Sequence, residues 1–359
     1  MCKRIFANQT NAVGDVPFYK IGTLGTNADS FISNSLFSEY KEKYNYPQKG
    51  ETLLTCSGTV GKCVQFDGEP SYYQDSNIVW LRGQSSPISN DFLFRLLKQN
   101  DWSKLNTTTI SRIYSSDLLS LSFNYPPTVK EQAYICSFLE LIDKQIETQS
   151  KIIKKYESLI KPLFDSLNKG PKHPVTIGEL GKYVSADSLS WDSINDCGNP
   201  VIIYGQLFTD YKYIIREVIS RTDAILKTVT HGNDLLFPSS TTVDALSLIA
   251  PASIKLHNVF LGGDMFKIEM DIAKFDSDYI SFLINCSYKE ELAKYAQGST
   301  IIHLHYDDIK SFKINICDIE EQKKISNALN LLLDKITVEK RLLELLRIQR
   351  RYLLGNMFI

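Results

Sequence analysis

Two stretches of the chain repeat apolar residues at alternating spacings of three and four. This heptad pattern predicts two long helices, at residues 129–168 and 319–359, each with one narrow apolar stripe. A helix with such a stripe needs a partner, so we expect the two helices to pair as an antiparallel coiled coil. The first stripe comprises Leu139, Ile142, Ile146, Ile153, Tyr156, Ile160 and Leu163, and the second comprises Leu332, Ile336, Leu343, Leu346 and Leu353.

The sequence before the first helix is similar, in the order of its motifs, to the sequence between the two helices. Residues 49–54 match residues 231–236, and Glu131-Gln132 match Glu321-Gln322 at the start of each helix. Such an ordered repeat predicts two globular domains, each followed by one helix. We place the boundaries at 1–128 for the first domain, 129–168 for the first helix, 169–318 for the second domain with a linker at about 169–174, and 319–359 for the second helix.

Each globular half mixes strand and helix signals, which predicts an α/β (α+β) fold. We expect strands at residues 77–81, 201–204 and 265–268, and short helices at residues 91–97 and 278–285. The second half also has a leader of residues 173–199, with a strand-like segment at Val175–Leu180, that has no counterpart before Pro17. We therefore expect the first domain to lack its opening strand, as in a truncated or inactive copy.

Composition excludes several classes of protein. The 43% hydrophobic content is enough to build folded cores. The sequence has no run of 18 apolar residues, which a membrane span needs, and no apolar leader of the kind that directs export. We therefore expect a cytoplasmic protein. The seven cysteines form no Cys-x-x-Cys pair, and His303-x-His305 lacks further ligands nearby, so we expect no metal. The net charge is only −1, and residues 169–318 hold 14 basic and 19 acidic residues. A protein with this charge could bind an anionic polymer only through a local basic surface or with the help of a partner.

Two domains on a helical spacer suit the reading of two DNA segments. The apolar stripe from Leu139 to Leu163 spans about 37 Å at 1.5 Å per residue, close to the 34–36 Å of one turn of B-DNA. A scaffold with two protein-binding heads has the same plan, and an independent nuclease is a more distant alternative. Asn124-Tyr-Pro-Pro127 has the letters of a methyltransferase loop in the wrong order, so we expect no enzyme.

The ordered motifs resemble one known family over essentially the whole chain. Gly50-Glu-Thr-Leu-Leu54, Ser57-Gly-Thr-Val-Gly61, Gln74-Asp-Ser-Asn-Ile78, and Pro126-Pro127 followed by Glu131-Gln132 are similar to a type I restriction-modification specificity subunit. The resemblance implies two target-recognition domains that each read half of a bipartite double-stranded DNA site. It implies helices that act as a ruler and dock two methyltransferase subunits, in a complex with restriction/translocase subunits. It also implies that S-adenosylmethionine, ATP and magnesium bind those partners, while this chain binds no cofactor.

Polar residues in small-residue loops are the candidates for DNA contact. Loops rich in Gly, Ser and Thr let backbone N–H groups and hydroxyls reach phosphates, and Arg112 suits guanine. Amides such as Gln74, Asn77 and Gln206 suit adenine. Simple hairpin or capped turns are the alternative interpretation of these loops. The candidates are Lys20, Ser57, Thr59, Lys62, Gln74, Asn77, Thr107, Thr108, Arg112, Tyr204, Gln206, Ser239, Ser240, Gln297, Ser299 and Thr300.

Overall fold

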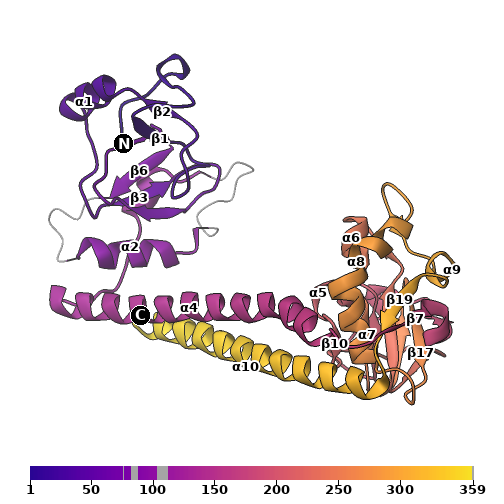
Figure 1. The fold of residues 1–359 in the computed structure, drawn as a ribbon. Coiled ribbons are helices and arrows are strands. Elements are labelled where there is room, and N and C mark those ends of the chain that lie inside the picture. The colour runs from indigo at the N-terminus through magenta and orange to yellow at the C-terminus, as the bar shows by residue number, and fades with distance from the viewer. Residues whose placement is uncertain (76, 82–87, 103–111, 358–359) are drawn as a thin grey trace. The chain divides into compact units, whose positions relative to one another are not determined.

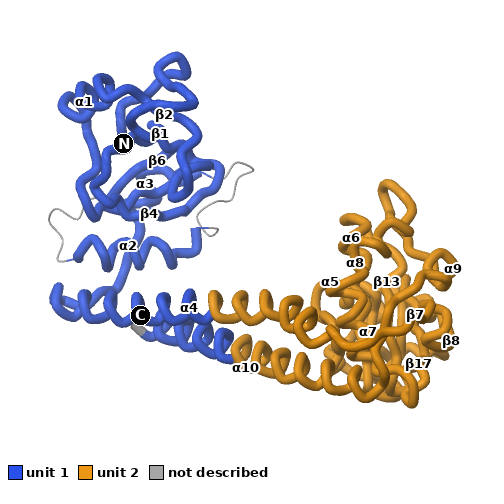
Figure 2. Tube along the Cα trace, viewed as in Figure 1, with its two compact units in different colours: residues 1–149, 342–359 blue, residues 150–341 orange. Residues whose placement is uncertain are grey.

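The computed structural model describes residues 1–75, 77–81, 88–102 and 112–357. Their contacts divide the chain into two compact units, residues 1–149 with 342–359, and residues 150–341. Figure 1 traces the elements, and Figure 2 colours the first unit blue and the second orange. Each of the two long helices contributes one part to each unit.

The first unit holds two small sheets and a helix that faces the start of α4 (Figure 1). One sheet has the order β2-β1-β5 and the other the order β4-β3-β6. Apolar residues of both sheets form one buried cluster, with Phe18, Leu53 and Tyr72 in it. Its elements are η1 (Ala7–Gln9), β1 (Val16–Tyr19), β2 (Phe31–Ile32), α1 (Asn34–Lys43), β3 (Thr52–Thr55), β4 (Cys63–Gln65), β5 (Tyr72–Tyr73), β6 (Ile78–Leu81), α2 (Asn90–Gln99) and α3 (Ser115–Leu119), with α4 (Val129–Leu167) following.

The second unit has larger sheets, of which the main one has the order β10-β15-β13-β17-β8. A four-stranded sheet, β11-β9-β16-β12, adjoins the same apolar core through Ile202 and Leu261. Its elements are β7 (His173–Thr176), η3 (Ile177–Leu180), β8 (Gly181–Ser185), η4 (Trp191–Ser193), β9 (Asn199–Ile203), α5 (Gln206–Thr209), β10 (Ile214–Ile215), β11 (Ser220–Thr222), β12 (Val229–His231), β13 (Asp234–Pro238), β14 (Ser240–Thr241), α6 (Ala245–Leu248), β15 (Ala252–Ile254), β16 (His257–Gly262), β17 (Met265–Met270), α7 (Ser277–Leu283), η5 (Ile284–Tyr288), α8 (Lys289–Leu292), η6 (Ala293–Tyr295), β18 (Ile302–His303), α9 (Tyr306–Ile309) and β19 (Lys313–Ile316), with α10 (Ile319–Met357) following.

The internal repeat is visible in the strand order. β3 pairs antiparallel with β4 and β6, and β13 pairs in the same way with β15 and β17. The sequence match of residues 49–54 with 231–236 therefore marks the same central strand in both domains. The helices predicted at 91–97 and 278–285 are α2 and α7. The prediction of a duplicated, mixed α/β chain is confirmed.

The segment that opens the second domain differs from its prediction. Val175–Leu180 is not one strand, because β7 ends at Thr176 and a 3-10 helix follows. Thr176 and Glu179 form a capping box, in which Glu179 Oε2 accepts a hydrogen bond from the Thr176 backbone N–H at 2.7 Å. This Thr-x-x-Glu signature was present in the sequence and overrides the β-rich composition.

The same leader covers two strands of the second domain. β7 pairs with β19, and β8 pairs along the outer edge of β17. In the part of the first domain that the structure describes, β6 pairs with β3 alone. The outer strand that β8 adds to the second domain thus has no counterpart among the described residues of the first.

The long helices pair antiparallel through their predicted stripes. Within the first unit, Arg350 Nε of α10 donates to Asp143 Oδ1 of α4 at 2.5 Å. Within the second unit, Lys340 Nζ lies 2.9 Å from Glu157 Oε1. Going from Asp143 to Glu157 along α4, the contacted residue of α10 changes from Arg350 to Lys340, which is the order expected for antiparallel helices. Every predicted stripe position is buried or half-buried.

A buried glutamine at the start of each long helix fastens that helix to its domain. Gln132 Nε2 donates to the Pro126 carbonyl at 2.9 Å, while its Oε1 accepts from the backbone N–H of Ser89, which caps α2. Gln322 repeats both bonds, to the Cys317 carbonyl and from the backbone of the residue that precedes α7. Both side chains are almost fully buried. The matched Glu-Gln pairs therefore mark a structural joint.

Replacing Gln322 with leucine, a residue of similar volume, should destabilise the second unit. The change removes all three hydrogen bonds of the side chain, including a third one to the Lys274 carbonyl. It leaves the buried Asp276 N–H unpaired, which costs about 1–3 kcal/mol. Urea unfolding followed by circular dichroism measures this loss. Lys323→Leu, on the exposed side of the same turn, is the control and should change stability little. Equal effects of the two variants would show that the joint contributes nothing.

Candidate nucleic-acid interface

In the first domain, predicted contact residues meet at one end of the β4-β3-β6 sheet. Ser57 Oγ donates to Asn77 Oδ1 at 2.7 Å, which joins the loop after β3 to the residue before β6. Ser57 also forms an isolated antiparallel bridge with Arg112. Gln74 Oε1 accepts a hydrogen bond from the Ile21 backbone N–H at 3.2 Å. Ser57, Asn77 and Arg112 thus come from three separate segments to form one polar edge, and Gln74 precedes Asn77 in the same segment.

The Ser57–Lys62 segment folds as a tight hairpin beside this edge. Gly61 has φ +85°, and a Cβ there would lie 2.2 Å from Trp102 Cδ1, so only glycine fits. The Lys62 N–H donates to Thr55 Oγ1 at 3.0 Å, while Thr59 is exposed at the tip. The hairpin interpretation therefore describes the local fold. Contact of Thr59 and Lys62 with phosphate stays a prediction.

Lys20 follows β1 and already has an acidic partner. Its ammonium lies 3.1 Å from Asp29 Oδ1 and 2.6 Å from Ser30 Oγ. The hydrogen bond from Ser30 and the nearby Lys20 ammonium lower the pKa of Asp29. Lys20 thus adds little net positive charge to the edge. Thr107 and Thr108 lie outside the described residues.

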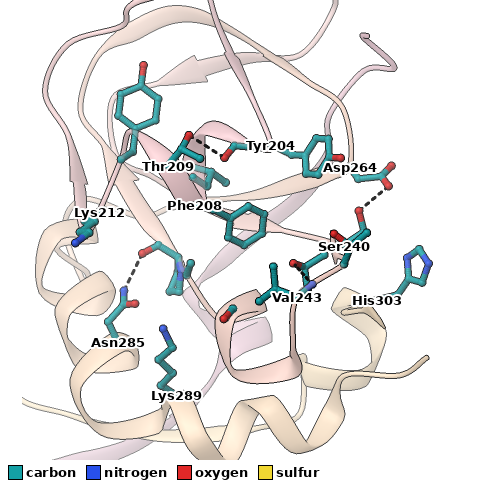
Figure 3. Close-up of a pocket in the computed structure, with 18 of the residues that line it drawn as sticks. Tyr204, Phe208, Thr209, Lys212, Ser240, Val243, Asp264, Asn285, Lys289 and His303 are labelled. Carbon is teal, nitrogen blue, oxygen red and sulfur yellow. Dashed lines mark hydrogen bonds between the residues drawn. The ribbon is translucent and has the colours of Figure 1, made fainter. Parts of the chain in front are cut away.

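The second domain has a cleft of about 800 Å³, which is lined by two of the predicted residues, Tyr204 and Ser240 (Figure 3). The Tyr204 ring packs close to Gly263, whose φ is +85°. Ser240 Oγ donates to Asp264 Oδ2 at 2.8 Å. The cleft therefore joins an aromatic ring, a hydroxyl and a carboxylate on one side.

A hairpin beside the cleft carries three further predicted residues. β14 pairs with β18, in the register Ser240 with His303, and Gln297 pairs with His303 through two backbone hydrogen bonds. Ser299 and Thr300 are exposed in the turn between Gln297 and His303. Gly298 in this turn has φ +116°. Ser239 is half-buried, and its backbone holds Asp264 and Leu304 in place.

The prediction for Gln206 needs correction. Its side chain is almost fully buried and makes three hydrogen bonds within the domain. Oε1 accepts from the Ile203 N–H, and Nε2 donates to Ser220 Oγ at 2.9 Å and to Asp210 Oδ2 at 3.2 Å. An amide used in this way supports β9, β11 and α5 and has no group to offer a base.

Sequence reasoning missed several groups that line the cleft. Lys212 and Lys289 lie on one side of it, while Asp264 lies on the other (Figure 3). Burial lowers the pKa of Lys289, the Asp244 carboxylate opposes this effect, and the charge of Lys212 adds a smaller lowering. Two lysines that line one side of a cleft favour an anion there. They are 77 residues apart in the chain, so no local pattern marked them.

Among the described residues, one group has the composition of a metal site, namely His231, Asp234 and Glu269. The Lys267 ammonium lies within it, 2.7 Å from Glu269 Oε1 and 3.6 Å from Asp234 Oδ1. The chain itself thus supplies the cation at this place. No helix in the described ranges combines the length and the apolar character needed to cross a membrane.

Comparisons with known proteins agree with this arrangement. The family model for the type I restriction modification DNA specificity domain matches residues 1–158 and 172–347. A protein of Haemophilus influenzae, named putative type I restriction enzyme specificity subunit S.HindORF215P, is 49% identical over 140 residues. That match spans 39% of this chain and 36% of the relative.

Two solved structures share the fold over nearly the whole chain. The S subunit of a type I restriction-modification system from M. genitalium gives a TM-score of 0.57 at 17% identity, with 100% of this chain and 92% of that chain covered. A structure described for complex assembly and conformational transition of the type I R-M system gives 0.58 at 14% identity, with 95% and 90% covered. The duplicated fold is therefore shared with proteins of this class.

Proposed function

Because the chain belongs to the type I restriction-modification DNA specificity family, a family of non-catalytic DNA-recognition subunits, we propose that it reads a bipartite DNA sequence with its two domains. The observation that carries this proposal is the structural repeat. Each domain has the same central three strands, and each is fastened by a buried glutamine, Gln132 or Gln322, to its own long helix. Two copies of one recognition fold suit a DNA site that consists of two separate half-sites.

The polar edge of each domain is where we place the DNA. In the first domain it comprises Ser57, Gln74, Asn77 and Arg112 beside the glycine-rich hairpin. In the second it comprises the cleft with Tyr204, Ser240 and the turn at residues 297–303. Hydroxyls and cations hold phosphates, while amides and carboxylates distinguish base edges.

The charge of the chain indicates that it does not act alone. With a net charge of −1, few phosphates are neutralised and affinity for DNA should be weak. We propose that methyltransferase subunits dock on the long helices and complete the DNA-binding surface. Restriction/translocase subunits would then join through the methyltransferase, which supplies the chemistry with its own cofactors.

A second apolar face of α10 supports such docking. It lies outside the stripe that pairs with α4, and its residues recur at spacings of three, four and seven. Large exposed apolar faces of this kind mark protein interfaces. The face comprises Leu331, Val338, Leu342, Leu345, Ile348 and Tyr352, whose side chains are 43–71% exposed.

Co-expression with an adenine methyltransferase tests the proposal. We expect the two proteins to co-purify and the complex to bind a DNA duplex at least tenfold more tightly than the chain alone. The chain alone should bind weakly, with an affinity that falls steeply with salt. A stable complex that binds no DNA would support the scaffold alternative. Failure to form any complex would contradict the proposed partner.

A further inference from the structure

Each domain has a similar serine hydrogen bond at its own polar edge. In the first domain, Ser57 Oγ donates to Asn77 Oδ1 at 2.7 Å. In the second, Ser240 Oγ donates to Asp264 Oδ2 at 2.8 Å. Each bond joins a serine two residues beyond the central strand to an Asn or Asp immediately before the neighbouring strand.

The strand register places both bonds at the same end of the central strand pair. Thr55 of β3 faces Ile78 of β6, and Pro238 of β13 faces Met265 of β17. In both domains the serine lies two residues beyond this facing pair, and the Asn or Asp lies one residue before it. β13 and β17 form one more facing pair than β3 and β6, so Asn77 and Asp264 correspond by their place at the end of the strand pair and not by sequence position.

These two side chains offer opposite hydrogen-bonding groups. Asn77 Oδ1 accepts from Ser57 with one lone pair, so its second lone pair and the amide N–H groups can form the paired contact that amides make with adenine. Asp264 is exposed, and its carboxylate only accepts hydrogen bonds. A carboxylate is repelled by phosphates but suits the amino group of cytosine.

We propose that Asn77 and Asp264, at corresponding ends of the central strand pairs, are specificity-determining residues of the two domains, with Asn77 reading adenine and Asp264 reading cytosine. The inference rests on the proposed DNA-binding function. In the second domain, positive and negative side chains also lie on different sides of the cleft, as binding of both a phosphate and a base would require. Lys212 and Lys289 lie on the side away from Asp264 (Figure 3), where a phosphate would be held while Asp264 faces a base.

The exchange variants Asn77→Asp and Asp264→Asn test this inference without removing the serine hydrogen bond. Either side chain accepts from the serine hydroxyl, so the local fold is kept. Wild type and both variants are compared in the methyltransferase complex by selection from randomised duplexes. Thermal unfolding of each variant should match that of the wild type.

We expect each variant to change base preference at a single position, and the two positions to lie in different half-sites. Asp264→Asn should lose discrimination for cytosine about tenfold and move toward adenine, since one good base contact is worth about 1–3 kcal/mol. Asn77→Asp should lose discrimination for adenine. Asp264→Asn should also bind unrelated duplexes more tightly, because one negative charge is gone. A purely structural role would produce neither change.

Asp271→Asn is the matched control, since Asp271 is an exposed carboxylate outside the cleft and its Asn variant keeps the hydrogen bond to the Ala273 N–H. It should leave base preference unchanged. If the wild-type complex selects a sequence and both exchange variants select the same one, the inference is wrong and the proposed function stands. If the wild-type complex selects nothing, the proposed function itself fails. Loss of all binding with a lowered unfolding temperature would assign these residues a structural role and overturn the inference.

Discussion

Lengthening both long helices by one heptad is expected to widen the preferred gap between the two DNA half-sites by about three base pairs. The insertions follow Gln149 in α4 and Glu339 in α10. Seven residues add about 10 Å to a helix. Successive base pairs are about 3.4 Å apart along the DNA axis. Because buried positions recur every seven residues, paired insertions keep the apolar stripes in register. We therefore propose that these helices set the spacing of the half-sites.

Single insertions are the matched controls for this experiment. One added heptad in α4 alone displaces pairs such as Asp143 with Arg350 in the first unit or Glu157 with Lys340 in the second. Such variants should lose stability and spacing preference together.

In the double-insertion variant, three added base pairs also rotate one half-site by about 100° about the DNA axis, so activity should fall even while the preferred gap shifts. A folded double-insertion variant that keeps the original gap would show that other parts of the complex set the spacing.

Placing a charge on the exposed apolar face of α10 is expected to abolish partner docking. Leu345 is 55% exposed, so Leu345→Asp should change the free energy of unfolding by less than about 0.5 kcal/mol, as surface substitutions generally do. In the complex the aspartate would be buried against an apolar partner surface without a counter-charge, which is strongly unfavourable. We expect affinity for the methyltransferase to fall at least a hundredfold, measured by calorimetry or analytical centrifugation.

Thr337→Asp is the control for that substitution. Thr337 is exposed on the same helix but does not belong to the apolar face, so the same aspartate there should leave docking nearly unchanged. Equal docking of the Leu345→Asp variant and the wild type would move the interface elsewhere on the chain. Equal loss by both variants would point to net charge rather than to this face.

The sequence predicted the features that repeat along the chain. Heptad spacing located both long helices, since an apolar stripe is periodic within one element. The matched Glu-Gln pairs located the joints, although their role emerged only when Gln132 and Gln322 were seen bonded to segments more than forty residues away. Order and periodicity are therefore readable without the fold.

The contact residues were harder to predict because loops from distant segments form them. Asp264 lies just before β17, and only its hydrogen bond to Ser240 in the folded domain indicates that it belongs to the candidate site. Gln206 looked like a base-reading amide, yet its neighbours Ser220 and Asp210 hold it inside the domain. A polar residue's exposure depends on the packing around it, which a sequence pattern does not report.

Selection from randomised duplexes is the most direct test of bipartite DNA recognition by this chain. The complex with an adenine methyltransferase is incubated with the duplex pool, and the bound or methylated fraction is sequenced. We expect two short conserved segments at a fixed gap, and no such pattern when the chain is omitted. A complex that assembles and methylates DNA without any sequence preference would contradict the proposed function.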